Sequence, residues 1–259
     1  MAEIPSIAVD RVSKVYATRT GRVEALVDVS FDVKPGEFVA LLGPSGSGKS
    51  TLMMIVAGLV EATSGQVRIG NTIVTKPYTD VGIVFQSAVL LDWRTTLQNI
   101  MFQAEMRRLP RAPLEARARA LIESVSLAGF EDKYPRELSG GMRQRVAICR
   151  ALVHDPPILL MDEPFGALDA LTREQMCIDL EKLLLTSGKT VLFITHSIRE
   201  AVQLADRVIV MTPRPGTIHR TIPVNLPRPR YEGATTSEEF ARLTAEIKDL
   251  FMAQGVLRT

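Results

Sequence analysis

The chain has 259 residues, of which 46% are hydrophobic and 23% are charged, so its composition excludes a disordered protein and a coiled coil. Its 31 Lys and Arg residues against 29 Asp and Glu residues leave a net charge of +2, which argues against nucleic acid as a partner. The two cysteines, Cys149 and Cys177, form neither a metal-type spacing nor a disulfide framework, which suits a reducing cytosol.

Neither a membrane span nor an export signal is predicted. The longest apolar stretch, residues 52–60, has about half of the ~20 residues needed to cross a bilayer. The start, MAEIPSIAVDR, lacks an apolar core and carries Glu3 and Asp10. We therefore expect a soluble cytosolic protein whose contact with a membrane is peripheral.

Short apolar runs rich in β-branched residues and broken by Gly and Pro predict strands up to Asp92. The segments are SIAVDRVSKVY, ALVDVSFDV, EFVALLG, GQVRIGNTIV and VGIVFQ. The first two alternate apolar and polar residues, as expected for strands with one solvated face. FVALL is continuously apolar and predicts a strand buried on both faces.

Helices dominate the next part of the chain. Residues 97–129 are rich in Arg, Ala, Leu and Glu, with apolar residues three and four apart, which predicts helices. The strand PPILLMDEP, the helix EQMCIDLEKLLLTSG, the strand TVLFITH and the helix IREAVQLA then follow in alternation, the first of these helices ending at Gly188. Beyond Met211, repeated prolines predict turns and extended chain, and an amphipathic helix is expected from Ser237 to about Met252.

This alternation of strand and helix predicts an α/β fold built on a mostly parallel sheet. The helical block between Gln86 and Pro156 has the character of an insertion into that core.

A phosphate-binding motif follows FVALL. Consecutive residues match G-x-x-x-x-G-K-[ST] in full: Gly43, Pro44, Ser45, Gly46, Ser47, Gly48, Lys49 and Ser50. The motif stands between a buried strand and the apolar helix TLMMIVAGL, which is the context that a P-loop requires. Backbone N–H groups at the helix start, including that of Thr51, are expected to hold phosphates, Lys49 to reach the β- and γ-phosphates, and Ser50 to ligate Mg²⁺. A plain Gly-rich turn is the weaker alternative.

Two carboxylates, Asp162 and Glu163, end the apolar strand ILLM. The carboxyl ends of strands are where α/β sheets bind ligands. Asp162 is expected to hold Mg²⁺, directly or through water, and Glu163 to orient or deprotonate the attacking water. The alternative is an ordinary solvated strand end, which a P-loop in the same chain disfavours.

Between these motifs stands LSGGMRQR, and here the sequence resembles the ATP-binding cassette family, whose signature is LSGGQ followed by a basic helix. The resemblance extends over nearly the whole chain and implies a P-loop NTPase (RecA-like) core with a β-rich subdomain and an inserted α-helical signature subdomain. It implies one domain over residues 1–259. Within it, residues 1–86 and 157–235 form the core with the β subdomain, residues 87–156 the helical subdomain, and residues 236–259 a C-terminal helix.

The family's order of motifs assigns further roles. Tyr16 matches the aromatic that stacks on adenine, Gln86 the residue that contacts Mg²⁺ and the lytic water, and His196 the histidine that senses the γ-phosphate. Asp169 matches the loop that crosses the dimer. The expected catalytic set is therefore Glu163, His196, Gln86 and Lys49, and the expected metal set is Ser50, Gln86 and Asp162.

A second anion-binding helix start is predicted at Ser139, Gly140 and Gly141. One γ-phosphate cannot use both helix starts if they lie far apart in one chain. The family's solution is a head-to-tail homodimer, in which each ATP is held by one subunit's P-loop and the other's signature.

Plain structural roles remain open for several residues. Tyr16 can be a strand aromatic packed in the core, His196 a structural histidine, and Asp169 a helix N-cap, alone or besides its role at the dimer. Both cysteines are better explained by buried packing. For the arginines Arg214, Arg220, Arg228 and Arg230, a solvated Pro-rich edge is favoured over contact with phospholipid.

A single signature without fused membrane helices implies the separate ATPase subunit of a membrane transporter, most of all a bacterial importer. VFQSAVLLDWRTTLQNI, LSGGM and MTPRPGTI resemble the nitrate/sulfonate/taurine importer group, from which the chain departs at Asp92, where the group usually has Pro. The alternatives are an ATPase for lipid, metal or other transport, and a non-transport assembly ATPase of the same superfamily.

The importer resemblance implies a peripheral position at the cytoplasmic face of the bacterial inner membrane. It also implies integral-membrane permease subunits and a periplasmic or lipid-anchored solute-binding protein as partners. The permease is expected to contact the segment that starts at Ser87 and ends at Asn99. Trp93, the only tryptophan, stands in that segment, and the alternative is that it caps the protein's own core.

Overall fold

A computed structural model describes residues 6–256 except 20, 186 and 232. Parts of two expected segments therefore lie outside the described residues. They are the ends of the expected single domain, at residues 1–5 and 257–259, and position 186 of the helix expected before Gly188.

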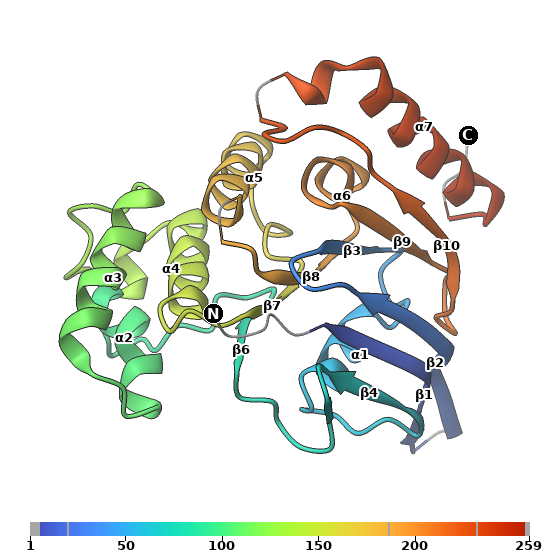
Figure 1. Ribbon diagram of the computed structural model, residues 1–259, viewed down its shortest axis with the longest axis horizontal. Coiled ribbons are helices and arrows are strands. Elements are labelled where there is room, and N and C mark those ends of the chain that lie inside the picture. Colours follow the sequence, from blue (N-terminus) through green and yellow to red (C-terminus); the bar gives the residue numbers. More distant parts are fainter. Residues whose placement is uncertain (1–5, 20, 186, 232, 257–259) are drawn as a thin grey trace.

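A six-stranded sheet in the order β10-β9-β3-β8-β7-β6 forms the centre of the molecule (Figure 1). Its strands are β3 (Phe38–Leu42), β6 (Val81–Val84), β7 (Ile158–Asp162), β8 (Thr190–Thr195), β9 (Arg207–Met211) and β10 (Ile218–Pro223). All pairs are parallel except the one at the β10 edge. Because every residue of β3, β7 and β8 is buried, these strands have the two covered faces that their continuous apolar sequence predicts. The predicted α/β class with a mostly parallel sheet is confirmed.

A second sheet of four antiparallel strands, in the order β2-β1-β4-β5, packs beside the first. It consists of β1 (Ile7–Thr18), β2 (Gly21–Val33), β4 (Ser64–Ile69) and β5 (Thr72–Ile73). The segment GQVRIGNTIV, expected as one strand, is two strands, because Gly70 takes a positive φ of 54° and opens a two-residue turn.

Two apolar cores cover the two faces of the central sheet. Ala40 and Leu42 of β3 belong to the core formed with α5 (Ala170–Leu184), α6 (Ile198–Leu204) and α7 (Glu238–Ala253). Val39 and Leu41 alternate with them and join the core formed with α1 (Lys49–Val56) and the antiparallel sheet. The period of two along β3 thus sends neighbouring side chains into different cores.

Three helices form a bundle at one side of the sheet (Figure 1): α2 (Thr96–Met106), α3 (Arg111–Ser124) and α4 (Gly140–Leu152). They share an apolar cluster of their own, which includes Ile100, Ile122 and Val146. A short 3₁₀ turn (Pro135–Glu137) precedes α4, and another (Ala234–Thr236) precedes α7. The helices predicted within residues 97–129 are confirmed, as is the amphipathic helix expected after Ser237.

The segment after Met211 contains a strand where only turns and extended chain were expected. The prediction was wrong because the prolines were taken to exclude a strand. Pro213 and Pro215 lie in the turn between β9 and β10, while Pro223 ends β10 at the sheet edge, where the missing N–H disrupts no inner pairing.

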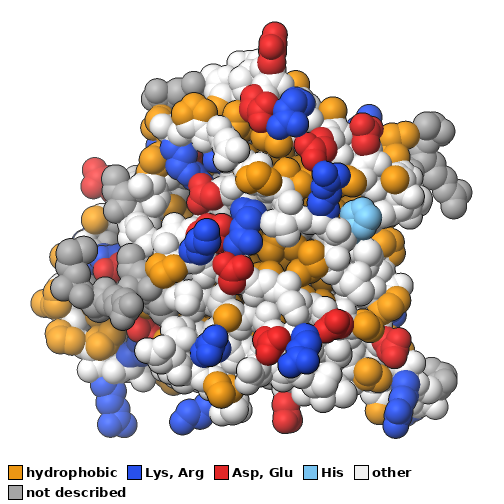
Figure 2. Space-filling model, turned by 45° about the vertical axis from the view of Figure 1, so that its right-hand side comes forward, with side chains coloured by type: hydrophobic (Ala, Val, Ile, Leu, Met, Phe, Trp, Pro, Cys, Tyr) orange, Lys and Arg blue, Asp and Glu red, His pale blue; other side chains and the backbone are white. Residues whose placement is uncertain are grey.

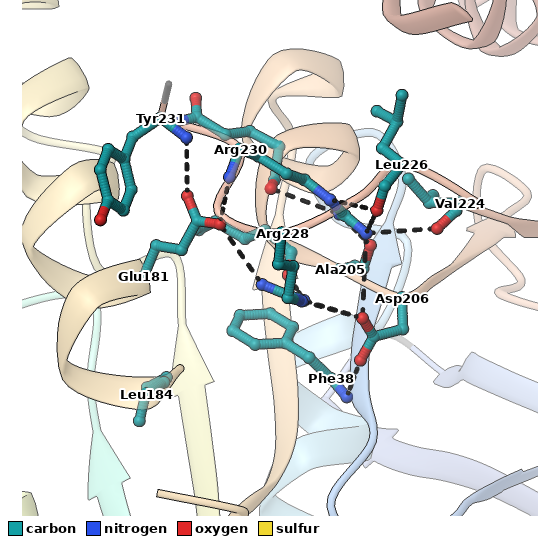
Figure 3. A network of polar contacts seen from close by, with 12 residues as sticks. Phe38, Glu181, Leu184, Ala205, Asp206, Val224, Leu226, Arg228, Arg230 and Tyr231 are labelled. Atoms are coloured by element: carbon teal, nitrogen blue, oxygen red, sulfur yellow. Dashed lines mark hydrogen bonds and ion pairs between the residues drawn. The ribbon is translucent and has the colours of Figure 1, made fainter. Parts of the chain in front are cut away.

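Two arginines expected at a solvated edge, Arg228 and Arg230, are instead held in a network of polar contacts (Figure 3). Arg230 is 1% exposed and donates to backbone carbonyls of several segments, among them those of Ala205, Val224 and Leu226. Arg228 donates to Asp206, which also forms an ion pair with Arg230. The solvated-edge interpretation is wrong for Arg230 and holds only in part for Arg228, which is 26% exposed, because the chain after β10 packs against α5 and the end of α6. It holds for Arg214 and Arg220, which are exposed.

No helix among the described residues is both long enough and apolar enough to cross a membrane. On the face shown in Figure 2, acidic and basic side chains are intermixed, in keeping with the near-balanced charge.

Candidate functional site

A pocket of about 360 Å³ lies where the P-loop follows β3 and Glu163 follows β7. Its lining comprises Tyr16, Val23, Ala25, Ser45, Gly46, Gly48, Lys49, Ser50, Thr51, Gln86, Glu163 and Arg214. Segments that are far apart in the sequence therefore meet beside the carboxyl edge of the parallel sheet, where such sheets bind ligands.

The P-loop is wrapped around the side chain of Lys49. This residue is 4% exposed, and its Nζ donates to the carbonyls of Gly43 at 2.8 Å and Pro44 at 2.9 Å. Burial lowers the pKa of Lys49, and the charges of Glu163 and Asp162 oppose that shift. Gly48 has a φ of 90°, and a Cβ there would lie 2.7 Å from the carbonyl oxygen of Ala25, so only glycine fits at the start of α1.

Asp162 lies beside the first turn of α1. Its Oδ1 accepts a hydrogen bond from Ser50 Oγ at 3.0 Å, and the residue is 8% exposed. Burial raises the pKa of Asp162, and the neighbouring charge of Glu163 adds to the rise. The alternative of a solvated strand end is therefore wrong.

Glu163 is held between two basic side chains. Its Oε2 lies 2.9 Å from His196 Nδ1, and its Oε1 lies 3.8 Å from Lys49 Nζ. The backbone of Glu163 has a φ of 42°, in the left-handed region, which costs a non-glycine residue about 1 kcal/mol. The surrounding contacts maintain this strained conformation, and with it a carboxylate at the wall of the pocket.

Tyr16 and Gln86 also line the pocket. Tyr16 is half-buried, and its Oη lies 3.5 Å from Thr51 Oγ1, so core packing does not account for its position. Gln86 follows β6 and is exposed. Both residues that the family resemblance assigns to the nucleotide thus line one pocket, although Tyr16 lies on β1 of the antiparallel sheet and Gln86 follows β6 of the central sheet.

The signature residues do not enter this pocket. Among the described residues that line it, none comes from the segment Ser139, Gly140 and Gly141. Ser139 is exposed and caps α4, its Oγ accepting from Met142 N at 3.2 Å. Asp169 is likewise exposed and caps α5 through a 3.0 Å bond from Thr172 N, so its expected N-cap role is confirmed.

Arg214 lines the pocket but was not expected there. Its Nη2 would lie 3.9 Å from a Cβ on Gly46, and its turn is pressed against the P-loop at Gly216, where a Cβ would come within 2.0 Å of the Ser47 carbonyl oxygen. The only sequence signal was the Arg-Pro-Gly run itself. Prolines next to arginine indicate an edge, whereas the contact of Gly216 with the P-loop depends on tertiary structure.

The residues near Ser50 are suited to Mg²⁺. The Ser50 hydroxyl and the Asp162 carboxylate already adjoin each other, and a cation there would offset the buried negative charge. The described residues contain no cluster of three or more His, Cys, Asp or Glu side chains that could hold a metal. One carboxylate with a hydroxyl is the sparse protein ligand set that Mg²⁺ uses when phosphates supply further oxygens.

The parallel sheet, the P-loop at its carboxyl edge and the adjoining carboxylates define a P-loop NTPase. A model of the ABC transporter family matches residues 26–166. The aliphatic sulfonates import ATP-binding protein SsuB of Bacillus cereus is 40% identical, over 98% of this chain and 99% of the relative. The taurine import ATP-binding protein TauB of Burkholderia pseudomallei is 48% identical, over 82% of each chain.

Among solved structures, the dimeric ATP-binding cassette MJ0796 in a post-hydrolysis state with ADP and Pi is 34% identical, with a TM-score of 0.76 over 85% of this chain and 99% of that one. The chain belongs to the ABC transporter family. It binds nucleotide and is an ATP hydrolase of that family.

Proposed function

We propose that this chain is the ATPase subunit of an importer for small oxyanion-type solutes, such as nitrate, sulfonates or taurine. The sulfonate and taurine import proteins described above support this solute class. We also propose that the subunit works as a head-to-tail homodimer. The observation that carries this is the pocket itself, which has a P-loop and a carboxylate but no signature residue from its own chain.

The proposed nucleotide contacts follow the pocket lining. Tyr16 stacks on the base, and the backbone of residues 43–51 with Lys49 holds the phosphates. For this, Lys49 exchanges its bonds to the carbonyls of Gly43 and Pro44 for phosphate oxygens. From the second subunit, Ser139, Gly140 and Gly141 close the site on the γ-phosphate side, and Asp169 contacts it across the interface.

Glu163 is the proposed general base toward the attacking water. His196 holds Oε2 of this carboxylate, which directs it and leaves Oε1 for the water once Lys49 has turned to the phosphates. Gln86 contacts the same water from β6. Mg²⁺, held by Ser50, Gln86 and Asp162, supplies charge neutralisation at the phosphates when it is bound.

The proposed permease contact is the segment from Ser87 to Asn99, within the proposed helical subdomain of residues 87–156. Arg150 of α4 donates to the carbonyls of Ala88 and Val89, both at 2.8 Å, so this segment is tied to the helix that begins at the signature. A groove of about 810 Å³ beside it is lined by apolar side chains, including Val89, Leu91 and Phe102. Trp93 is 74% exposed, so the alternative that it caps the core is wrong.

Such a groove suits a short apolar helix of a permease. The other proposed divisions are the core with the β subdomain, residues 1–86 and 157–235, and the C-terminal helix, residues 236–259. The subunit would then lie at the cytoplasmic face of the bacterial inner membrane, with a solute-binding protein on the far side.

The substitution Glu163→Gln tests the composite site. The amide keeps the shape of the carboxylate but loses its basicity, so ATP is expected to bind, turnover to fall by about 10²-fold or more, and an ATP-bound dimer to accumulate. Size-exclusion chromatography with and without ATP measures the dimer, with Glu174→Gln, an exposed glutamate of α5, as the control. Hydrolysis at the wild-type rate would remove Glu163 from the mechanism, and a variant that stays monomeric with ATP bound would contradict the composite site.

A further inference from the structure

A buried carboxylate lies behind the loop that carries His196. Glu200, on α6, is 5% exposed, and its pKa is raised chiefly because burial disfavours the charged form. Its Oε2 accepts a hydrogen bond from Thr195 Oγ1 at 2.5 Å. Glutamate is rarely buried to this extent without a charged partner, and the nucleotide contacts described above make no use of it.

Glu200 completes a set of hydrogen bonds around the backbone of His196. Thr195 Oγ1 accepts from Ser197 N at 2.9 Å, and Ser197 Oγ accepts from Glu200 N at 3.3 Å. His196 lies between Thr195 and Ser197, so these bonds determine the direction in which its side chain leaves the end of β8. That direction brings Nδ1 to 2.9 Å from Glu163 Oε2.

Arg173 connects Glu200 to the loop of residues 167–169, which precedes α5. Its Nη2 donates to the carbonyl of Leu168 at 3.0 Å, and its Nε lies 3.6 Å from Glu200 Oε1. This buried Nε has no hydrogen-bond partner among the described residues. A shift of a few tenths of an ångström would turn the ion pair into a hydrogen bond. The two side chains face a cavity of about 290 Å³ between α5 and α6, which gives the guanidinium room to move.

We propose that Arg173 and Glu200 form a positioning pair that couples the loop of residues 167–169 to His196. The inference rests on the proposed composite site. When the loop seats on a second subunit, displacement of Leu168 carries the guanidinium with it, and Glu200 transmits the shift to the backbone around His196. His196 then directs Glu163 correctly only in the dimer. Neither member of the pair touches the nucleotide, so both act through His196.

The substitutions Glu200→Gln and Arg173→Gln test the pair. Each keeps a polar side chain and removes the charge, so kcat for ATP hydrolysis is expected to fall roughly tenfold while KM for ATP stays within about twofold. The double variant is expected to be no slower than either single variant, because both changes break the same connection. Steady-state kinetics on the full chain, at a subunit concentration that gives the dimer, measure all three variants.

Glu174 and Arg199 provide a matched control. They form an ion pair of 3.0 Å between the same two helices, but both are exposed, and among the described residues it is Arg173 and Glu200 that hydrogen-bond to Leu168 and Thr195. Glu174→Gln and Arg199→Gln are expected to keep wild-type kcat. If these variants slow hydrolysis as much as the buried ones, or if the two buried changes act independently, the coupling is overturned. If Glu200→Gln does not fold, Arg173→Gln, which alters a side chain that is 33% exposed, carries the same test.

Failure of the pair and failure of the composite site give different results. If wild-type specific activity depends on subunit concentration but Arg173→Gln and Glu200→Gln behave like the control variants, only the positioning pair is overturned. If wild-type specific activity does not change on dilution to monomer, the composite site and the coupling built on it are both overturned.

Discussion

Strain, burial and charge are concentrated in a few side chains around the nucleotide pocket. Glu163 has a left-handed backbone, Lys49 and Asp162 are buried, and the pKa values of Lys49 and Asp162 move in opposite directions because burial disfavours both charged forms. Strained backbone and buried charged groups both lower stability, and their concentration in one place is typical of sites whose geometry serves a reaction.

His154, between α4 and β7, is expected to weaken the fold in acid. Burial, reinforced by the charge of Arg107, lowers its pKa from 6.5 to about 4. As the pH falls through this range, the unfolded chain binds the proton before the folded chain does, so the free energy of unfolding decreases. Between about pH 7 and about pH 4.5, His154→Gln should lose about 1 kcal/mol less than the wild type. Urea unfolding at both pH values measures this, and equal losses would show that His154 titrates normally.

For single residues, the sequence identifies those that stand in a local motif but not those whose position depends on tertiary contacts. Lys49, Asp162 and Glu163 were predictable because each stands in a local pattern whose chemistry is specific. Arg214 and Arg230 were not, because their positions depend on a turn docking against the P-loop and on a segment folding back over α6. Cys149 and Cys177 were correctly assigned to packing, and burial raises the pKa of the Cys149 thiol to about 12.

Among the helices and strands, periodicity succeeded where one pattern ran unbroken and failed at prolines and short turns. The inner strands β3, β7 and β8 and the amphipathic α7 were predictable for that reason. The strand β10 was missed because it stands between prolines and ends at Pro223, which is tolerated only at an edge, and edge position is a property of the assembled sheet. The bond from Arg150 to the segment before α2 links elements that are 61 residues apart, which no local pattern records.

At this scale, Trp93→Ala tests the proposed permease contact. Because the side chain is 74% exposed, its removal should change the melting temperature by less than about 1 °C. Permease binding should weaken at least tenfold, and solute-stimulated hydrolysis in the assembled complex should be lost, since exposed tryptophans at interfaces carry about 2 kcal/mol or more. Ile73→Ala, on the antiparallel sheet and 54% exposed, is the control. A large fall in melting temperature with intact coupling would place the contact elsewhere.

In the whole molecule, the two groups of residues that the proposed composite site combines do not line one pocket. The P-loop and Glu163 line one pocket, while Ser139 and Asp169 are exposed at helix starts outside it. The family resemblance predicted that the P-loop of one subunit and the signature of another form one site, whereas the residues alone did not. The chain folds as described without bringing them together, which is what a site completed by a second copy requires.

If a second subunit completes the site, the ATPase activity is expected to depend on the subunit concentration. In dilute solution without the permease, active dimer should increase with the square of the subunit concentration, so ATPase activity per subunit should rise about in proportion to concentration. A dilution series over about a hundredfold range, with the association state followed by sedimentation, measures this. Constant activity per subunit from a protein shown to be monomeric would contradict the composite site.

The network around Arg230 determines how far the chain can be shortened. Glu181 on α5 accepts hydrogen bonds from the backbone N–H groups of Arg230 and Tyr231, at 2.7 and 3.1 Å, and lies near Arg228 as well. A fragment cut after β10 would leave this carboxylate in an apolar interior with none of these partners. The smallest piece able to fold alone therefore extends well past the family match at residue 166, to Tyr231 at least. For this protein, the segment that matches the family and the segment needed for independent folding are therefore expected to have different boundaries.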